Sequence, residues 1–326
     1  MPSALSYLAF QQRGGIADLS SRAKFRLTGA DRVRYLNGQV TANVTRLGPA
    51  DALPACVTTA KGRLCGEIFI SALPDALLID TEPELRELLF QRLEKYIIAD
   101  DAALEDVTDS LALFHLLPAV TEEPAAAPDC TPPSRRARRF GPTGCDLVVP
   151  AAEAPAYLAQ NASAAAQDEP SSTPDPRRPL LSAGLLDLIR IENGVPAWGR
   201  DLGEETLPPE AGLDRTHIDY HKGCYIGQEV ISRLKSVGHV NRELRRFVSA
   251  DEVPGDSARP LAPGMTLFAA GEPNRAVGQL TSAAYSFALG KPIALGYLKR
   301  GAPTDGLFAR RAEEDPSAAI PVRIQG

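Results

Sequence analysis

Prolines are concentrated in the middle of this chain and limit which elements can form there. Of the 28 prolines, 12 fall between Pro118 and Pro179. Proline lacks a backbone N–H and restricts the residue before it, so a share of prolines about twice the average marks this stretch as different from the rest of the chain. Its Ala-, Ser- and Asp-rich pieces also bury too little apolar surface to order themselves. We expect a flexible insertion at about residues 160–179, preceded by an ordered segment that contains a strand over Cys145–Val149.

The chain before this stretch combines strand and helix patterns. Residues 25–28, 56–59, 64–71 and 76–79 read as strands, with a Lys61-Gly62 turn between the second and the third. Apolar residues spaced three and four apart predict a helix over Glu82–Ile98. Strands followed by a helix that can cover them are typical of an α+β layer.

The chain after the proline-rich stretch has first a helical pattern and then a strand pattern. Ser182–Ile191 returns to helical spacing. From residue 242 onward, short β-like runs over 246–249, 266–269, 276–286 and 292–298 alternate with Gly and Pro turns. This spacing predicts a small β-barrel or sandwich at the C-terminus. Length alone predicts about two domains.

Charge and cysteine content exclude several classes of protein. A net charge of −6 and a pI near 5.4 argue against a general binder of phosphate backbones, although they do not exclude a local basic groove. Five cysteines without a CxxC pair fit a reducing compartment better than a disulfide scaffold. With no apolar run of about 18 residues and no secretory signal pattern, we expect a soluble, cytoplasmic chain without a membrane partner.

Cys224 lies in the segment that carries most of the chemistry. It follows Lys222 and precedes apolar residues at helical spacing, so it is expected at or just before a helix N-terminus. The helix dipole and a neighbouring ammonium both favour a thiolate, which is the environment of a reactive cysteine. The alternative is a small buried hydrophobic residue in a Gly-rich turn.

Glu192 is the second candidate because it ends the apolar helix at 182–191. Its carboxylate can accept two parallel N–H bonds from a flat heterocycle such as a pterin or a guanine. Alternatively, it is a surface residue paired with Arg190. Trp198, the only tryptophan, either stacks on a ligand or fills the core or a domain interface.

An H-x3-H-x2-C cluster, formed by His217, His221 and Cys224, is a candidate metal site. Two histidines four apart on one helix can share a metal ion. Gly223 interrupts such a helix, however, and Lys222 brings a cation to the site. We therefore predict no metal.

The same segment resembles a known family. KGCYIGQE at Lys222–Glu229 resembles the signature of the YgfZ-type folate-binding proteins, relatives of the glycine cleavage T-protein, an aminomethyltransferase. RIENG at 190–194, PAWG after it and LPPEAGL at 207–213 resemble the R-x-E-x-G and P-x-E-x-G-L run of that family. LTGADRVRYLNGQVTANV at 27–44 and VGQLTSAAYSFALGKPIALGYLKR at 277–300 resemble its N-terminal segment and C-terminal barrel. The likeness spans most of the chain.

The resemblance implies an α+β fold in which three domains form a ring. A folate-binding α+β domain would comprise residues 1–110 and part of 180–240. A second α+β domain would comprise 111–180, including the insertion, with the rest of 180–240. A β-barrel would follow at 242–326. The central opening of such a ring holds tetrahydrofolate or another folate.

The resemblance also implies a function. YgfZ-type proteins support the assembly or repair of iron–sulfur clusters and, through one such enzyme, affect tRNA modification. The implied partners are folate and iron–sulfur enzymes or cluster-assembly proteins, without direct nucleic-acid contact, and we expect a monomer. Cys224 is then the functional thiol, supported as a thiolate by Lys222. Glu192 contacts the pterin, with Arg190, Trp198 and Tyr225 as further cofactor-binding residues.

Whether the chain is an enzyme stays open. T-proteins carry a catalytic aspartate in a GGIIDD-like strand, and the corresponding GRLCGE stretch places Gly66 there, with Glu67 one residue later. Neighbours in a strand point to opposite faces, so Glu67 is predicted to be a poor substitute for this acid group. The alternatives are a folate-dependent aminomethyltransferase or demethylase, and a non-enzymatic interaction protein with a vestigial folate pocket.

Overall fold

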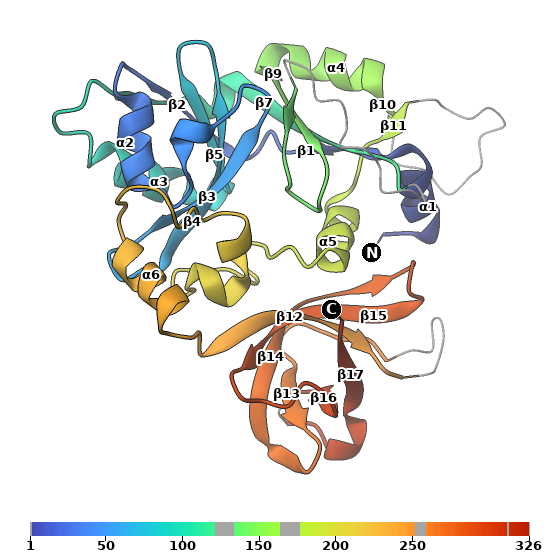
Figure 1. Cartoon of the computed structure of the whole chain (residues 1–326). Coiled ribbons are helices and arrows are strands. Elements are labelled where there is room, and N and C mark those ends of the chain that lie inside the picture. The colour runs from blue at the N-terminus through green and yellow to red at the C-terminus, as the bar shows by residue number, and fades with distance from the viewer. Residues whose placement is uncertain (1, 121–133, 164–176, 252–258, 312, 326) are drawn as a thin grey trace.

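The computed structural model describes residues 2–120, 134–163, 177–251, 259–311 and 313–325. They form a five-stranded sheet, a four-stranded sheet and a closed barrel, with helix α5 (Ala183–Glu192) between them (Figure 1). The five-stranded sheet is blue in Figure 1, the four-stranded sheet contains green strands, and the barrel is orange to red. The predicted α+β class with a C-terminal barrel is confirmed. Of the helices in the described ranges, none is long and apolar enough to cross a membrane.

The five-stranded sheet has the order β3-β4-β5-β2-β6, with all neighbours antiparallel. Leu89 and Leu93 of the covering helix are fully buried in its core. The predicted strands are confirmed, but the predicted helix over 82–98 is shorter, because residues 83–85 form a 3-10 turn and the α-helix ends at Glu94. The elements of this layer are β2 (Ala23–Thr28), α2 (Arg32–Gln39), β3 (Ala52–Thr58), β4 (Leu64–Ala72), β5 (Leu77–Thr81), α3 (Arg86–Glu94) and β6 (Ala103–Asp106).

The second sheet has the order β1-β7-β9-β8. It consists of β1 (Gly15–Asp18), β7 (Leu111–Leu117), β8 (Arg135–Arg136) and β9 (Cys145–Pro150), and β9 confirms the strand predicted at 145–149. Strand β1 pairs with β7, so helix α1 (Ala4–Arg13) and β1 lie with this second sheet. The predicted boundary at 1–110 had assigned both elements to the first domain. A strand of four residues is too short for its sequence to indicate its partner.

The expected insertion at 160–179 lies partly outside the described residues, which omit 164–176. Helix α4 (Ala154–Asn161) leads into it, and β10 (Ala162–Ser163) pairs in parallel with β11 (Arg178–Pro179). Tyr157 of α4 stacks on Phe114 of β7 with 4.8 Å between ring centroids. The two described ends of the insertion are therefore held together beside the second sheet.

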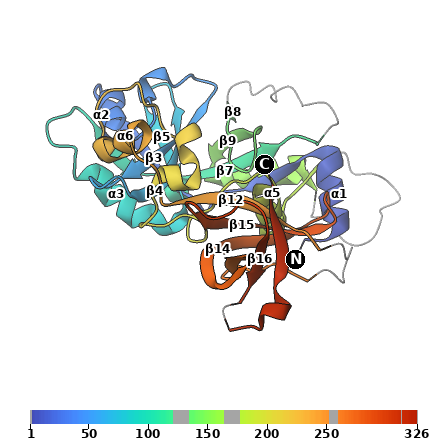
Figure 2. The same ribbon diagram turned by 60° about the horizontal axis from the view of Figure 1, so that its bottom comes forward.

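The barrel closes in the order β12-β15-β14-β13-β16-β17, because β12 pairs with both β15 and β17. Its strands are β12 (Arg242–Ser249), β13 (Thr266–Ala269), β14 (Glu272–Ser286), β15 (Lys291–Lys299), β16 (Leu307–Arg310) and β17 (Ile320–Gln325). The four predicted runs are confirmed, whereas β16 and β17 were not predicted. Helix α5 packs on the barrel strands β14 and β15, and Figure 2 shows it behind β12 and β15.

A buried charge cluster joins the two sheets. Arg139, in the loop before β9, donates to both carboxylate oxygens of Asp80 on β5 at 2.9 and 2.7 Å. The same guanidinium donates to Asp146 on β9 at 2.7–2.9 Å. Arg22 binds Asp80 at 2.6 Å, and Nδ1 of His115 lies 2.7 Å from Asp146. Burial acts to raise the pKa of Asp146, but Arg139 and His115 outweigh it and hold this pKa well below its ordinary range.

Substituting Arg139→Met should destabilise the fold strongly, because two buried carboxylates lose their shared partner. Removing one partner of a buried ion pair costs about 3–5 kcal/mol, measurable as a lower free energy of unfolding in urea. The matched control is Arg275→Met on the barrel, where an exposed arginine pairs with Glu272 at 3.0 Å and the expected cost is about 0–1 kcal/mol. Equal losses in the two variants would show that Arg139 does not hold the sheets together.

Candidate functional site

A cavity of about 630 Å³ lies where the two sheets, the segment after α5 and the barrel meet. Its volume lies within the range of about 300–1,000 Å³ that is typical of small-molecule sites. We call it the central cavity. Its lining comes from β3 and β4 (Pro54, Glu67), the 138–142 loop (Arg138, Gly141, Pro142), residues 193–196, 211–213 and 215–217, and the barrel (Leu244, Arg245, Arg246, Leu295, Gln325).

Glu67 and His217 form a hydrogen-bonded pair in the wall of this cavity. Oε1 of Glu67 lies 2.7 Å from Nε2 of His217, and the hydroxyl of Thr216 lies 2.7 Å from Nδ1. Burial acts to raise the pKa of Glu67, but the His217 hydrogen bond and the charges of His217, Arg22 and Arg139 lower it overall. The carboxylate is therefore ionised at neutral pH and accepts the N–H of Nε2.

The position of Glu67 corrects the sequence analysis. Glu67 and Gly66 do point to opposite faces of β4, as expected. A Cβ on Gly66, however, would lie 2.8 Å from side-chain atoms of Leu85 and Leu89, in the core beneath α3. The face of β4 that borders the cavity is that of Glu67 and not that of Gly66, whereas its suitability as a substitute for the acid stays a prediction. The sequence suggested a role for His217 only as a metal ligand, and no sequence pattern predicts its contact with Glu67.

Glu192 directly precedes the cavity-lining segment 193–196 but does not itself line the central cavity. Its carboxylate accepts the hydroxyl of Tyr7 at 2.9 Å and that of Ser286 at 2.6 Å. It makes no ion pair with Arg190, which rules out the surface-pair alternative. Asn193 follows it directly and lines the cavity, as does Arg246, which donates to the backbone carbonyl of Glu192. A carboxylate offers about four acceptor sites, so two hydroxyls do not saturate it.

The other three residues predicted to bind cofactor, like Glu192, are not among the residues that line the central cavity. Arg190 is buried and donates to Asp201 and to Ser282 of the barrel, both at 2.7 Å. Trp198 is half-buried and packs on the core of the five-stranded sheet. Tyr225 is buried with its ring 5.2 Å from Nζ of Lys222. Arg190 therefore joins α5 to the barrel.

Cys224 is an exposed free thiol, which excludes the buried alternative. It lies three residues before Gly227, the N-cap of helix α6 (Gln228–Ser236), and it does not line the central cavity. The contacts of Lys222 differ from the predicted support of the Cys224 thiolate. The ammonium of Lys222 donates to the carbonyls of Val40 and Ala42 at 2.7 and 2.8 Å, and also to that of Asn37. Backbone carbonyls after a helix lack intrahelical partners, and Lys222 satisfies these at the end of α2.

The remaining cysteines of the described residues differ in burial and in bonding. Cys56 is a buried free thiol and Cys65 a half-buried one, whereas Cys145 is disulfide-bonded. Within the described ranges, no three His, Cys, Asp or Glu side chains are arranged to hold a metal ion. His217 faces Glu67 at the cavity wall, while Cys224 lies on the outside of the molecule.

Alkylation should distinguish the three free thiols. Burial raises the pKa of Cys56 and of Cys65, so both are protonated at neutral pH as well as shielded. Brief iodoacetamide treatment of the native chain should therefore modify Cys224 first, as read by peptide mass spectrometry. Unfolding in urea at the same pH should bring the three rates close together. Faster labelling of Cys65 than of Cys224 in the native chain would contradict the exposed position of Cys224.

Comparisons with known proteins identify one group of relatives. The profile of the glycine cleavage T-protein C-terminal barrel domain matches residues 245–325. An aminomethyltransferase of Rubrobacter xylanophilus is 26% identical over 97% of this chain and 83% of its own length. The tRNA-modifying protein YgfZ of Cronobacter sakazakii is 25% identical over 70% of this chain and 69% of its own length. An iron–sulfur cluster assembly factor IBA57 homologue of Neurospora crassa is 25% identical over 75% of this chain and 57% of its own length.

The fold is also that of a solved structure. The glycine cleavage system aminomethyltransferase T of Bartonella henselae superposes with a TM-score of 0.79 at 15% sequence identity, covering 99% of this chain and 88% of that one. At this identity the likeness concerns the fold, and it agrees with the α+β arrangement with a C-terminal barrel.

Proposed function

We propose that this chain, which is similar to the glycine cleavage T-protein and to YgfZ and IBA57 relatives, binds tetrahydrofolate or another folate in the central cavity and supports iron–sulfur cluster assembly or repair. The observation that carries the proposal is the central cavity itself, with the ionised Glu67 in its wall. A vestigial pocket would be filled by side chains, whereas this one is open. Relatives named for cluster assembly and for tRNA modification support the second half of the proposal.

The residues of the cavity fit a folate. Apolar walls from Pro54, Leu213 and Leu295 suit a flat heterocycle and its aromatic linker. The carboxylate of Glu67 is an acceptor for the N–H edge of a pterin, and His217 fixes its orientation. The unused acceptor capacity of Glu192, which directly precedes the cavity-lining Asn193, is the second proposed contact for the same kind of edge. When bound, the folate supplies a carrier for one-carbon groups, and the residues of this chain bind and orient it.

Cys224 serves a different part of the proposed function. Its thiol is exposed, and it lies away from the lining of the central cavity. It is therefore placed to meet a protein surface, a sulfur species or a cluster more readily than the folate. We propose iron–sulfur enzymes or cluster-assembly proteins as its partners in the cytoplasm, with the chain acting as a monomer and any effect on tRNA modification being indirect.

Removing either carboxylate should weaken folate binding. A hydrogen bond to a charged group contributes about 1.5–3 kcal/mol, so Glu67→Gln and Glu192→Gln should each raise the Kd for tetrahydrofolate by roughly ten-fold or more, measured by anaerobic calorimetry. Glu272→Gln is the matched control, because Glu272 is exposed on the barrel and pairs only with its neighbour Arg275. Unchanged affinity in both cavity variants would remove the folate proposal.

The thiol should matter in cells. In a strain lacking its own copy of this protein, wild type should restore the activity of an iron–sulfur enzyme, and Cys224→Ala should restore little of it at equal soluble protein. Cys65→Ala removes a half-buried thiol outside the motif and should restore activity like wild type. Full restoration by Cys224→Ala would exclude the proposed role of this thiol.

Glu67 also favours one second candidate, a folate-dependent aminomethyltransferase or demethylase. Such a reaction needs a carboxyl group near the folate, and Glu67, which the sequence analysis predicted to be a poor substitute for this acid, lies in the cavity wall. The lowered pKa of Glu67 suits an acceptor or a charge stabiliser better than a proton donor. Turnover of an aminomethyl donor by wild type that disappears in Glu67→Gln would establish this candidate.

A further inference from the structure

Thr216, His217 and Glu67 form one chain of hydrogen bonds in the wall of the central cavity. The hydroxyl of Thr216 lies 2.7 Å from Nδ1 of His217, and Nε2 of the same ring lies 2.7 Å from Oε1 of Glu67. Because the carboxylate of Glu67 accepts the N–H of Nε2, the free lone pair of the ring is on Nδ1. The hydroxyl of Thr216 therefore donates its hydrogen bond to His217.

This order of hydroxyl, imidazole and carboxylate is that of an activated nucleophile. The hydroxyl attacks, the imidazole accepts its proton, and the carboxylate orients the imidazole. Such a triad is recognised by the geometry and the roles of its members, whatever their order in the chain. In the serine protease triad the two ring nitrogens have exchanged places. Since either nitrogen accepts a proton when the other carries one, the exchange keeps the chemistry.

The backbone and the ring of this base are fixed by the surrounding fold. The N–H groups of Thr216 and His217 donate to the carbonyl of Leu213 at 3.2 and 2.8 Å. The carbonyl of His217 accepts the hydroxyl of Thr41 at 2.6 Å. The imidazole is buried and packs edge-on against Phe69, with 6.4 Å between ring centroids. A general base needs such a fixed position relative to the proton that it removes.

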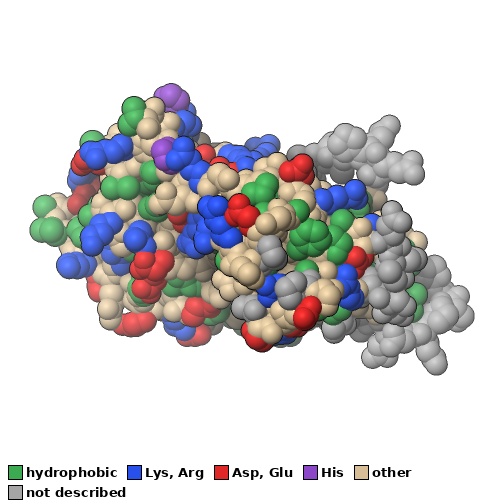
Figure 3. Space-filling model, turned by 90° about the horizontal axis from the view of Figure 1, so that it is seen from below, with side chains coloured by type: hydrophobic (Ala, Val, Ile, Leu, Met, Phe, Trp, Pro, Cys, Tyr) green, Lys and Arg blue, Asp and Glu red, His purple; other side chains and the backbone are tan. Residues whose placement is uncertain are grey.

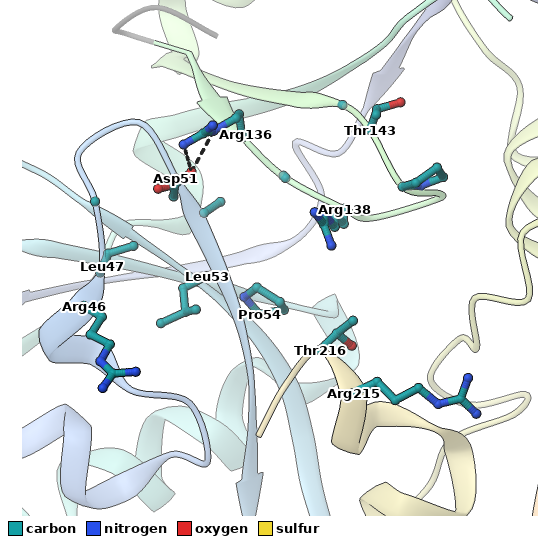
Figure 4. A pocket seen from close by; sticks show the side chains of 15 residues that line it. Arg46, Leu47, Asp51, Leu53, Pro54, Arg136, Arg138, Thr143, Arg215 and Thr216 are labelled. Atoms are coloured by element: carbon teal, nitrogen blue, oxygen red, sulfur yellow. Dashed lines mark hydrogen bonds and ion pairs between the residues drawn. The ribbon is translucent and has the colours of Figure 1, made fainter. Parts of the chain in front are cut away.

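The hydroxyl of Thr216 is accessible to a small molecule. Thr216 is exposed and lines the central cavity as well as a neighbouring cavity of about 520 Å³. Figure 4 shows this second cavity, with Thr216 on the side opposite to the 136–144 segment. Pro54 and Pro142 line both cavities and give apolar walls against which a small acyl group can pack.

The charge near Thr216 suits the anion that forms when a hydroxyl attacks a carbonyl group. Arg138 and Arg215 line both cavities, and neither forms an ion pair within the described ranges. Figure 4 shows Arg138 on the 136–144 segment and Arg215 next to Thr216. Cations near a developing oxyanion lower the barrier to acyl transfer. Figure 3 shows basic and acidic side chains interspersed over the face seen from the barrel side, without this local excess of arginine.

We propose that Thr216, His217 and Glu67 form an esterase site. Thr216 is the nucleophile, His217 is the general base, and Glu67 is the positioning residue that orients His217. The substrate class is a small carboxylic ester that enters through the second cavity. This activity is separate from the proposed function, because it requires neither a folate nor an iron–sulfur partner.

The reaction proceeds in two balanced steps. Oγ1 of Thr216 attacks the ester carbonyl carbon, and the hydroxyl proton passes to Nδ1 of His217. The bond from this carbon to the alcohol oxygen then breaks, the alcohol leaves with the proton from Nδ1, and the acyl group stays on Thr216. Water attacks the acyl-threonine with His217 as base again, which releases the carboxylic acid and restores the hydroxyl.

Acetylation by p-nitrophenyl acetate tests the site on the full chain. Wild type should release p-nitrophenolate, and samples quenched in acid should carry an acetyl group on Thr216, as read by fragmentation in peptide mass spectrometry. General base catalysis contributes about 10²–10⁴-fold, so Thr216→Val and His217→Gln should each lower the release rate about a hundred-fold or more. Thr216→Ser keeps the hydroxyl and should keep the rate. Glu67→Asp keeps the carboxylate and should retain more of the rate than Glu67→Gln.

The matched controls are Thr45→Val and His239→Gln, which change exposed residues outside both cavities and should react like wild type. Release of p-nitrophenolate without an acetyl group on Thr216 would overturn the site, as would acetylation of Thr216 at an unchanged rate in His217→Gln. If His217→Gln does not fold, equal rates in Thr216→Val and Thr216→Ser would overturn it instead. The assay contains no folate, so its failure and a failure to bind folate are separate results.

Discussion

The guanidinium of Arg139 is the contact on which the arrangement of the two sheets depends. It is buried between a carboxylate of each sheet and binds both. It also lies 3.9 Å above the ring of Phe69, which in turn packs edge-on against His217. Phe69 follows Glu67 by two positions on β4 and shares its face. The guanidinium that joins the sheets therefore also supports, through Phe69, the histidine that orients Glu67. The orientation of Glu67 in the cavity wall thus depends on the buried Arg139.

Two further positively charged side chains, Arg190 and Lys222, connect other parts of the fold. Arg190 joins α5 to Asp201 and to the barrel, and Lys222 fixes the segment before α6 onto the end of α2. Both residues belong to the motifs on which the family resemblance rests, and both were expected to act on cofactor or thiol chemistry. In this fold their charges are satisfied by carboxylate, hydroxyl and carbonyl groups within the protein. A motif therefore contains structural as well as functional residues, and only the contacts tell them apart.

The sequence predicted well what depends on local pattern. Strands β2 to β5, β9 and most of the barrel follow from alternation and turn residues, and α5 follows from helical spacing after Ser182, which caps it by accepting the N–H of Leu185. It predicted poorly what depends on pairing between distant segments. Nothing in four residues of β1 indicates β7 as its neighbour, and alternation on β4 shows that Gly66 and Glu67 face apart without showing which face borders a cavity. The contact between Glu67 and His217, which are 150 positions apart, likewise depends on the tertiary structure and not on local pattern.

One hairpin links the cavity to the exposed thiol. Glu67 lies on β4, and Thr58, near the turn of the β3–β4 hairpin, donates its hydroxyl to the carbonyl of Ile226 at 2.5 Å. Gly227 follows with φ +90°, and a Cβ there would lie 2.5 Å from the carbonyl oxygen of Thr59, so glycine alone allows the segment to approach this closely. Cys224 is thereby anchored to the hairpin that carries Glu67, although it faces outward. A ligand in the cavity would contact the hairpin through Glu67, whereas a partner at the thiol would contact the segment that the hairpin holds in place.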